Sequence, residues 1–165
     1  MTLRAIMAAI ALACLFSTTA QAEPQTDQNK TVYPGVRHIT TQESVNKVEA
    51  LLRQALEKRG LTLFTVIDHT QGAVDAGLEL PPTLTVIFGN PKVGTPWMQC
   101  QGSVALDLPQ KMVIRMVDDG TRIEWNDPAY LVDRHGLQGC KPSPDKIAKV
   151  LNEVAREAAG EEKPE

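Results

Sequence analysis

Two stretches of the chain repeat apolar residues every three or four positions, which is the spacing of an amphipathic helix. The first carries Val45, Val48, Leu51, Leu52, Ala55 and Leu56 on one face, before Gly60. The second follows Ser143-Pro144 and carries Ile147, Val150, Leu151, Val154, Ala155 and Ala158. Thr40 and Glu43 have the spacing of a capping box, so we expect the first helix to begin beside Thr40. The pattern predicts two long helices, each with one buried face.

Six shorter segments are rich in β-branched and apolar residues, as strands are. They are residues 36–40, 61–67, 84–88, 104–108, 111–117 and 121–125. Segment 84–88 lies between Pro81-Pro82 and Gly89-Asn90-Pro91, which favours a short, buried, central strand. Asp118-Asp119-Gly120 is typical of a hairpin turn, so the last two strands are predicted to pair antiparallel.

Short helices are predicted between these strands. Residues 70–76 end at Gly77, and Thr95-Pro96 and Asp127-Pro128 each resemble a helix N-cap followed by proline. The second of these would run to His135 and end at Gly136. The order of elements predicts one α+β domain over residues 35–159, with two long helices on one face of a largely antiparallel sheet. Residues 160–165 form a charged tail.

The first 22 residues have the pattern of an export signal. Residues 1–4 carry a positive charge, residues 5–16 are apolar, and Ala20-Gln21-Ala22 has the form of a signal-peptidase site. We therefore predict cleavage after Ala22, a disordered linker over 23–34, and a periplasmic or secreted protein. Lipidation at Cys14 is the alternative. No segment has the roughly 20 apolar residues that a membrane-spanning helix needs.

The net charge bears on the kind of partner, and the cysteines bear on a disulfide or a metal site. The chain has 17 Lys and Arg against 20 Asp and Glu, a net charge of −3, which disfavours nucleic acid. In an exported protein, Cys100 and Cys140 favour a disulfide, which would contribute about 3 to 4 kcal/mol on the chain-entropy model. Two separate buried thiols, or soft ligands for a metal such as copper, remain alternatives.

Three residues are candidates for acid/base chemistry: Asp68 and His69 where a strand ends, and His135 at the end of a predicted helix. The pKa of a histidine lies near working pH, so each could act as a base or a ligand. Capping or packing is the competing interpretation for all three. His38 completes the histidine set, which has no metal-ligand spacing, so we predict no metal and no cofactor.

Other side chains are candidates for ligand binding. Asn90 and Lys92 lie in a glycine- and proline-containing loop that resembles a phosphate loop only partly, because the lysine before the final hydroxyl is missing. Asp107 and Asp127, with Glu79, are candidates for a carboxylate pair. Trp97, Met98 and Trp125 are candidates for an apolar pocket or a dimer interface, with core packing as the competing interpretation.

Six motifs in order resemble the bacterial family called domain of unknown function 302. They are Asp68-His69, Gly77-Leu78-Glu79-Leu80-Pro81-Pro82-Thr83, Phe88-Gly89-Asn90-Pro91, Gly94-Thr95-Pro96, Ala105-Leu106-Asp107-Leu108-Pro109, and Asn126-Asp127-Pro128 with Arg134-His135-Gly136-Leu137. The resemblance covers residues 36–158. It implies a fold like the TATA-binding-protein superfold, strand-helix-four strands-helix, often as a dimer. It implies neither DNA binding nor a particular activity.

Three functional hypotheses follow. The first is an exported, non-catalytic module that binds a small ligand or an envelope protein, as a homodimer. The second is an acid/base or hydrolytic enzyme in which Asp68, His69 and His135 converge on one pocket. The third is an envelope metal or redox protein that uses Cys100 and Cys140.

Overall fold

The computed structural model describes residues 33–161. The predicted leader, most of the predicted linker and residues 162–165 of the tail lie outside this range. The elements follow in the order β1 (Val36–Thr41), α1 (Val45–Lys58), β2 (Thr62–Asp68), α2 (His69–Asp75), β3 (Thr83–Gly89), α3 (Pro91–Cys100), η1 (a 3-10 helix, Gly102–Leu106), β4 (Gln110–Val117), β5 (Gly120–Asn126), α4 (Pro128–His135) and α5 (Pro144–Ala158).

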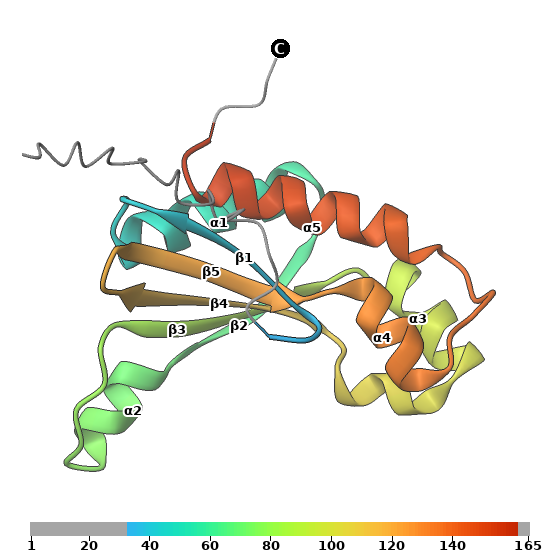
Figure 1. Cartoon of the computed structure of the whole chain (residues 1–165), viewed down its shortest axis with the longest axis horizontal. Helices are drawn as coiled ribbons and strands as arrows, with labels where there is room; N and C mark the ends of the chain where they lie inside the picture. Colours follow the sequence, from blue (N-terminus) through green and yellow to red (C-terminus); the bar gives the residue numbers. More distant parts are fainter. Residues whose placement is uncertain (1–32, 162–165) are drawn as a thin grey trace, which may run out of the picture.

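The strands form one antiparallel sheet in the order β1-β5-β4-β3-β2. Helices α1 and α5 pack against each other and cover one face of the sheet (Figure 1). The core between the two layers includes Leu52, Val86, Ile114, Ile123 and Val154, all fully buried. The predicted α+β architecture, with two long helices on one face, is confirmed.

Both predicted helical stripes face this core. Each has one member that is less buried than the periodicity suggests: Leu51 is only partly buried, and Val150 is exposed. Helix α4 begins after Asp127 and ends at Gly136, as predicted. Gly136 has φ of 67°, the left-handed conformation in which glycine terminates helices at least cost.

Two predicted helix starts are wrong. Helix α1 is capped by Ser44, because β1 continues through Thr41 and leaves no room for a cap at Thr40. Helix α3 starts at Pro91, where Asn90 Oδ1 accepts the backbone N–H of Lys92 at 2.9 Å. Asn90-Pro91 is the same cap-then-proline signal as Thr95-Pro96, five residues earlier, so Pro96 lies inside the helix.

The segment 104–108, predicted to be extended, is helical instead. The 3-10 helix η1 buries Val104, and the backbone N–H groups of Asp107 and Leu108 both bond to the Val104 carbonyl. Strand β4 starts only at Gln110, which lies opposite Phe88 near the end of β3. Upstream of Gln110 there is little of β3 left to pair with, so the chain coils.

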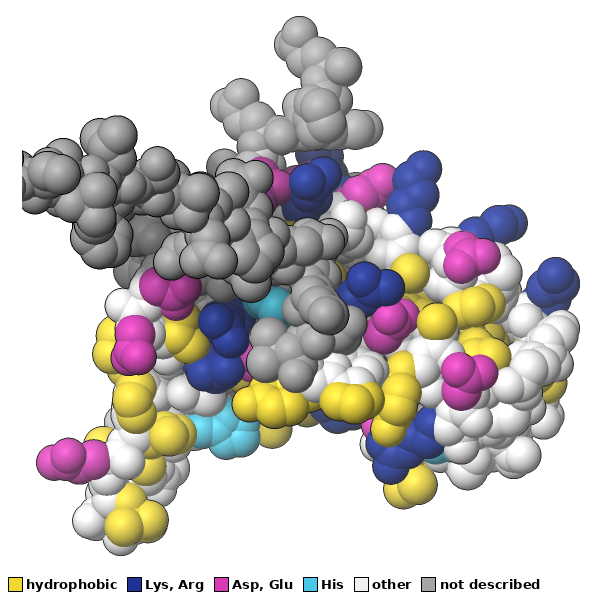
Figure 2. Space-filling view, viewed as in Figure 1, with side chains coloured by type: hydrophobic (Ala, Val, Ile, Leu, Met, Phe, Trp, Pro, Cys, Tyr) yellow, Lys and Arg dark blue, Asp and Glu magenta, His cyan; other side chains and the backbone are white. Residues whose placement is uncertain are grey.

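The two ends of the sheet differ in how much structure surrounds them. Helix α2 forms an arm that leaves the sheet at one end and has no buried residue (Figure 1). Apolar side chains lie on the surface of this arm (Figure 2), and Val74, Leu78 and Leu80 are exposed there. At the opposite end, α3, η1 and α4 gather beneath the start of α5. The packed end is the one that encloses a cavity.

Candidate functional site

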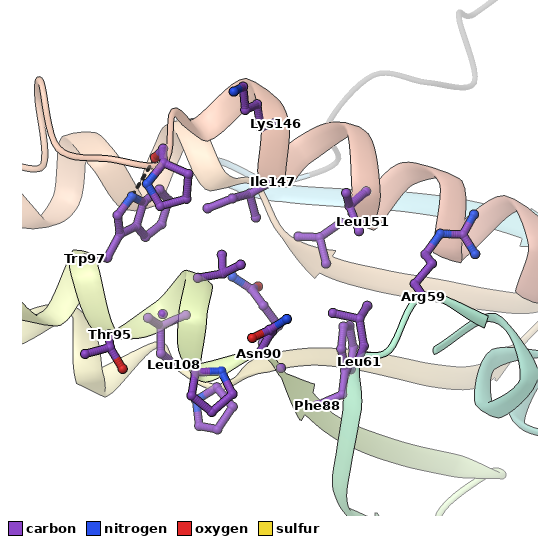
Figure 3. Close-up of a pocket in the computed structure, with 18 of the residues that line it drawn as sticks. Arg59, Leu61, Phe88, Asn90, Thr95, Trp97, Leu108, Lys146, Ile147 and Leu151 are labelled. Atoms are coloured by element: carbon purple, nitrogen blue, oxygen red, sulfur yellow. Dashed lines mark hydrogen bonds between the residues drawn. The ribbon is translucent and has the colours of Figure 1, made fainter. Parts of the chain in front are cut away.

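An apolar pocket of about 710 Å³ lies between α3 and α5, above the adjoining ends of β3 and β4. Ile147 and Leu151 point into it from α5, and Leu108 and Asn90 face them from below (Figure 3). The lining residues are Arg59, Leu61, Phe64, Phe88, Gly89, Asn90, Pro91, Val93, Gly94, Thr95, Trp97, Met98, Leu108, Pro109, Gln110, Pro142, Lys146, Ile147, Val150, Leu151 and Glu153. Pockets of 300–1,000 Å³ with mainly apolar walls are the usual size for small molecules.

A hydrogen bond and a disulfide hold the two walls of the pocket together. Trp97, only 1% exposed, donates its indole N–H to the carbonyl oxygen of Pro142 at 2.8 Å (Figure 3). Cys100 at the end of α3 is bonded to Cys140, with the two Cα atoms 6.2 Å apart. The predicted disulfide is therefore present, and neither sulfur is a thiolate available to a metal. Both links join α3 to the segment that leads into α5.

One buried polar side chain lies in this apolar wall. Gln110 is 9% exposed, and within residues 33–161 its side-chain amide makes no hydrogen bond but is not fully enclosed, since it borders the cavity. An amide has both donors and an acceptor, so a polar group of a ligand in the cavity can bond to it. The Asn90 amide oxygen is already engaged in capping α3. Gln110 is thus the buried group best placed to recognise a polar atom of a ligand.

The charged residues lie at the edge of the pocket and are mostly paired. Arg59 donates to both carboxylate oxygens of Glu157, at 3.0 and 2.6 Å, and lies 3.6 Å from Glu153. The hydrogen bonds that Arg59 donates lower the pKa of Glu157 to about 2, and the same bonds raise the pKa of Arg59. Lys146 borders the cavity at the start of α5, and its side chain extends from the upper side of that helix (Figure 3). The interior is suited to an uncharged group.

A second cluster joins η1 to α4. Ser103 Oγ lies 3.0 Å from Nδ1 of His135, and Asp107 Oδ2 lies 2.6 Å from Nε2 of the same ring. Arg134 Nη1 is 3.4 Å from that carboxylate oxygen. The His135 side chain is 4% exposed, whereas Ser103 is exposed. The sequence indicates His135 and Asp107 as separate candidates and gives no signal for Ser103.

Asp68 and His69 lie at the other end of the sheet. Asp68 caps α2 by accepting the Gln71 backbone N–H at 2.9 Å, and His69 Nε2 lies 2.8 Å from Thr85 Oγ1. Asp68 is opposite Leu84, at the start of β3, whereas β4 begins beside the end of β3. His69 and His135 therefore do not meet, and the hypothesis of one pocket shared by all three candidates is wrong.

The remaining candidates are dispersed. Asp127 caps α4 through the Ala129 N–H at 3.0 Å and pairs with Arg37 at 2.8 Å. Glu79 and Lys92 are exposed on the α2–β3 loop and on α3. Trp97 and Met98 line the pocket, but Trp125 borders a smaller one of about 270 Å³ beside Asp127. Within residues 33–161, no three His, Cys, Asp or Glu side chains are grouped so as to hold a metal ion.

The fold and pocket define a small α+β domain with an apolar cavity between its helices and its sheet. The chain belongs to the family described as Domain of unknown function DUF302, whose model matches residues 37–154. The fold is also that of an uncharacterized conserved DUF302 protein from Bacillus stearothermophilus. That crystal structure has a TM-score of 0.69 and 19% identity, and the match covers 75% of this chain and 98% of that one. The family resemblance predicted from the motifs is confirmed.

Two curated relatives bear the name fluoride-specific ion channel FluC 1. The proteins from Brucella suis biovar 1 and Brucella abortus biovar 1 are each 40% identical to this chain over 104 residues, which is 60% of this chain. The matched region is 40% and 38% of those proteins, so the chain spans about two fifths of the length of these relatives. Among residues 33–161, no helix is long and apolar enough to cross a membrane.

Proposed function

We propose that this protein binds a small, mostly apolar, uncharged molecule in the cavity between α3 and α5. The observation that carries the proposal is that the Gln110 side-chain amide, which makes no hydrogen bond within residues 33–161, lies in the wall of an apolar pocket of about 710 Å³. An apolar body would fill the space between Trp97 and Leu151, and one hydroxyl or carbonyl group would bond to Gln110. Burial of the apolar part supplies affinity, and the amide supplies selectivity.

A matched pair of probes tests the two parts of this proposal separately. Naphthalene and 2-naphthol have the same apolar body and differ by one hydroxyl. Equilibrium dialysis with the purified protein should show tighter binding of 2-naphthol, by about three- to tenfold, the equivalent of one neutral hydrogen bond. Gln110→Leu should remove this preference while it leaves naphthalene binding in place. Equal binding of both probes to the unmodified protein would contradict the role of the amide.

A second variant tests whether the cavity is the binding site at all. A Cβ at Gly94 would meet Leu108 Cδ1 at 3.6 Å, an ordinary contact, so Gly94→Leu should fit the backbone and fill the pocket. We expect both probes to lose at least tenfold in affinity. Gly72 on α2, where a Cβ meets nothing within 4 Å, is the matched control, and Gly72→Leu should bind normally. Unchanged binding to the Gly94 variant would place the ligand elsewhere.

The channel-named relatives make fluoride a ligand worth testing directly. The cavity is a poor site for fluoride, because a small, strongly hydrated anion loses much free energy in an apolar environment and the nearby Arg59 is already paired. If the cavity does not bind fluoride, the region that this chain shares with those relatives would act in them as a separate binding module. Sodium fluoride should not displace 2-naphthol from the pocket, and displacement at millimolar fluoride would overturn this assignment.

Export and dimerisation are part of the same proposal. The leader pattern supports a periplasmic or secreted location, which cell fractionation with mass measurement of the mature N-terminus would test. The family resemblance supports a homodimer, and light scattering of the purified protein would give its mass. A mass of one chain at micromolar concentration would contradict the dimer and would leave the pocket proposal intact.

A further inference from the structure

We propose that Ser103 is the nucleophile of an acyl-transfer site, with His135 as its general base and Asp107 as the group that orients His135. This site lies between η1 and α4 and goes beyond the binding function proposed for the cavity. Its substrate class is small carboxylic esters. The proposal rests on a continuous chain of hydrogen bonds from the exposed Ser103 hydroxyl, through the buried His135 imidazole, to the Asp107 carboxylate.

The contacts fix which ring nitrogen carries the proton. The Asp107 carboxylate can only accept at 2.6 Å, so Nε2 of His135 donates to it. Nδ1 then has a free lone pair, and the Ser103 hydroxyl donates to it at 3.0 Å. A serine hydroxyl aimed at an unprotonated imidazole whose other nitrogen is held by a carboxylate is the arrangement that activates serine nucleophiles. Here the two ring nitrogens exchange the positions they have in serine proteases.

The surroundings hold the pair in place and leave the hydroxyl accessible. Ser103 follows Cys100 by three residues, and His135 precedes Cys140 by five, so the disulfide ties together the two segments that carry them. The His135 ring is sheltered, whereas Ser103 is open to solutes. Leu106, 75% exposed, lies on the same 3-10 helix and offers an apolar contact for the alkyl part of an ester.

The reaction would proceed in two balanced steps. Ser103 Oγ attacks the ester carbonyl carbon while its proton moves to Nδ1 of His135. The bond from that carbon to the alcohol oxygen breaks, and the imidazolium returns the proton to the departing alkoxide, which leaves an acyl-serine. Water then attacks the acyl carbon, His135 takes its proton, and cleavage of the carbon–Oγ bond releases the acid as the proton returns to Ser103.

The first test is covalent labelling, because a merely structural network does not activate its serine. The purified protein, with its disulfide intact, is incubated with a fluorophosphonate probe and digested, and the modified peptide is mapped by mass spectrometry. We expect the probe on Ser103. Ser143→Ala is the matched control, since Ser143 caps α5 without a side-chain hydrogen bond, and this variant should label normally. Absence of the probe from Ser103 in the folded protein would overturn the proposal.

The second test is hydrolysis of p-nitrophenyl acetate. Ser103→Ala removes one exposed hydroxyl, so it should keep the fold while the rate falls at least tenfold. His135→Gln should lower the rate by about 100-fold, the low end of the usual contribution of a general base. His69→Gln is the matched control, because His69 also lies beside a hydroxyl, that of Thr85, but no carboxylate of the described residues 33–161 bonds to its other nitrogen.

The outcomes separate this site from the cavity. Labelling of Ser103 that persists in Gly94→Leu, where the cavity is filled, would show an independent site. A rate that Ser103→Ala leaves unchanged, or that His69→Gln lowers as much as His135→Gln, would overturn the acyl-transfer role. Either of these results leaves the binding proposal standing, since that proposal rests on Gln110 and not on Ser103.

Discussion

The two ends of the sheet are built in different ways. At the α2 end, the side chains of the helix bond within it or to the strand that follows it: Asp68 caps the helix, Gln71 bonds to Asp75 at 2.8 Å, and His69 bonds to Thr85. At the α3 end, partners tens of residues apart meet: Trp97 with Pro142, and Ser103 with His135. Local contacts stabilise a short helix only weakly, whereas burial and long-range links stabilise a tertiary arrangement.

This difference explains which end holds the sites. A cavity persists only when its walls are held apart by a rigid frame, and a buried imidazole keeps its geometry only when packing fixes it. The α2 arm has exposed apolar residues but no buried one. The conspicuous Asp68-His69 pair therefore lies on the less constrained end, and the less conspicuous Ser103 and Gln110 lie on the constrained one.

Truncation of one large apolar residue at each end should give the largest contrast. Trp97→Ala removes a fully buried side chain and its hydrogen bond to Pro142, at a cost of about 3 to 5 kcal/mol in the free energy of unfolding. Leu78→Ala on the α2 arm, where the side chain is 65% exposed, should cost less than about 0.5 kcal/mol. Urea unfolding measures both. Similar losses would show that the α2 arm is as firmly packed as the α3 end.

Removal of the disulfide should come next in size. Cys100 and Cys140 close a loop of 40 residues, and the chain-entropy model gives this link about 3 to 4 kcal/mol. Cys100→Ser with Cys140→Ser should lower the unfolding free energy by that amount and weaken 2-naphthol binding, because the link joins the two walls of the pocket. The rate of backbone amide hydrogen exchange should increase in α3 and stay the same in α2. Unaltered stability in the double variant would mean that packing alone holds this end.

Much of the fold could be predicted from the sequence because its signals are local and redundant. The stripes of α1 and α5 repeat over three to four turns, and Asp127-Pro128 with Gly136 marks both ends of α4. Segment 104–108 was misassigned because its composition suits a strand and only the register of β4 shows that too little of β3 remains to pair with. Helix α3 was misplaced because two cap-then-proline signals lie five residues apart.

The sites were harder to predict than the fold. His135 and Asp107 were chosen for their chemistry, but nothing local indicated that they touch, since they are brought together by the path of η1. Ser103 has no sequence signal at all. Gln110 is conspicuous only once it is known to lie on the helix-covered face of β4, at the position where an apolar residue is expected. Contacts between distant segments decide all of these.

The two hydrogen-bonded histidines extend the comparison to polar groups. His135→Gln removes a buried ring that bonds to both Ser103 and Asp107, and should cost about 1 to 3 kcal/mol in unfolding free energy. His69→Gln removes an exposed ring with one bond, to Thr85, and should cost less than about 0.5 kcal/mol. Urea unfolding at pH 7 compares them. A larger loss of unfolding free energy in His69→Gln than in His135→Gln would mean that the α2 end is the more constrained of the two.

The smallest effect is the pH dependence of the ion pair between α1 and α5. The hydrogen bond from Arg59 depresses the pKa of Glu157 from 4.5 to about 2, so this carboxylate binds its proton more readily in the unfolded chain than in the folded protein. Its contribution is therefore complete above about pH 4.5 and is lost as the pH falls toward 2. The side chains are partly exposed to solvent, so we expect about 1 kcal/mol at pH 7.

Unfolding curves from pH 7 to pH 2 test this for the unmodified protein and Glu157→Gln. The stability difference between the two should be constant down to about pH 4.5 and shrink below it, because protonation removes the charge that the variant already lacks. Asp75→Asn on the α2 arm, where the carboxylate accepts a bond from exposed Gln71, should cost a few tenths of a kcal/mol at pH 7. If the unfolding free energies of the protein and of Glu157→Gln change in parallel as the pH falls, Arg59 does not favour the ionised carboxylate. The contact between α1 and α5 would then depend on apolar packing alone.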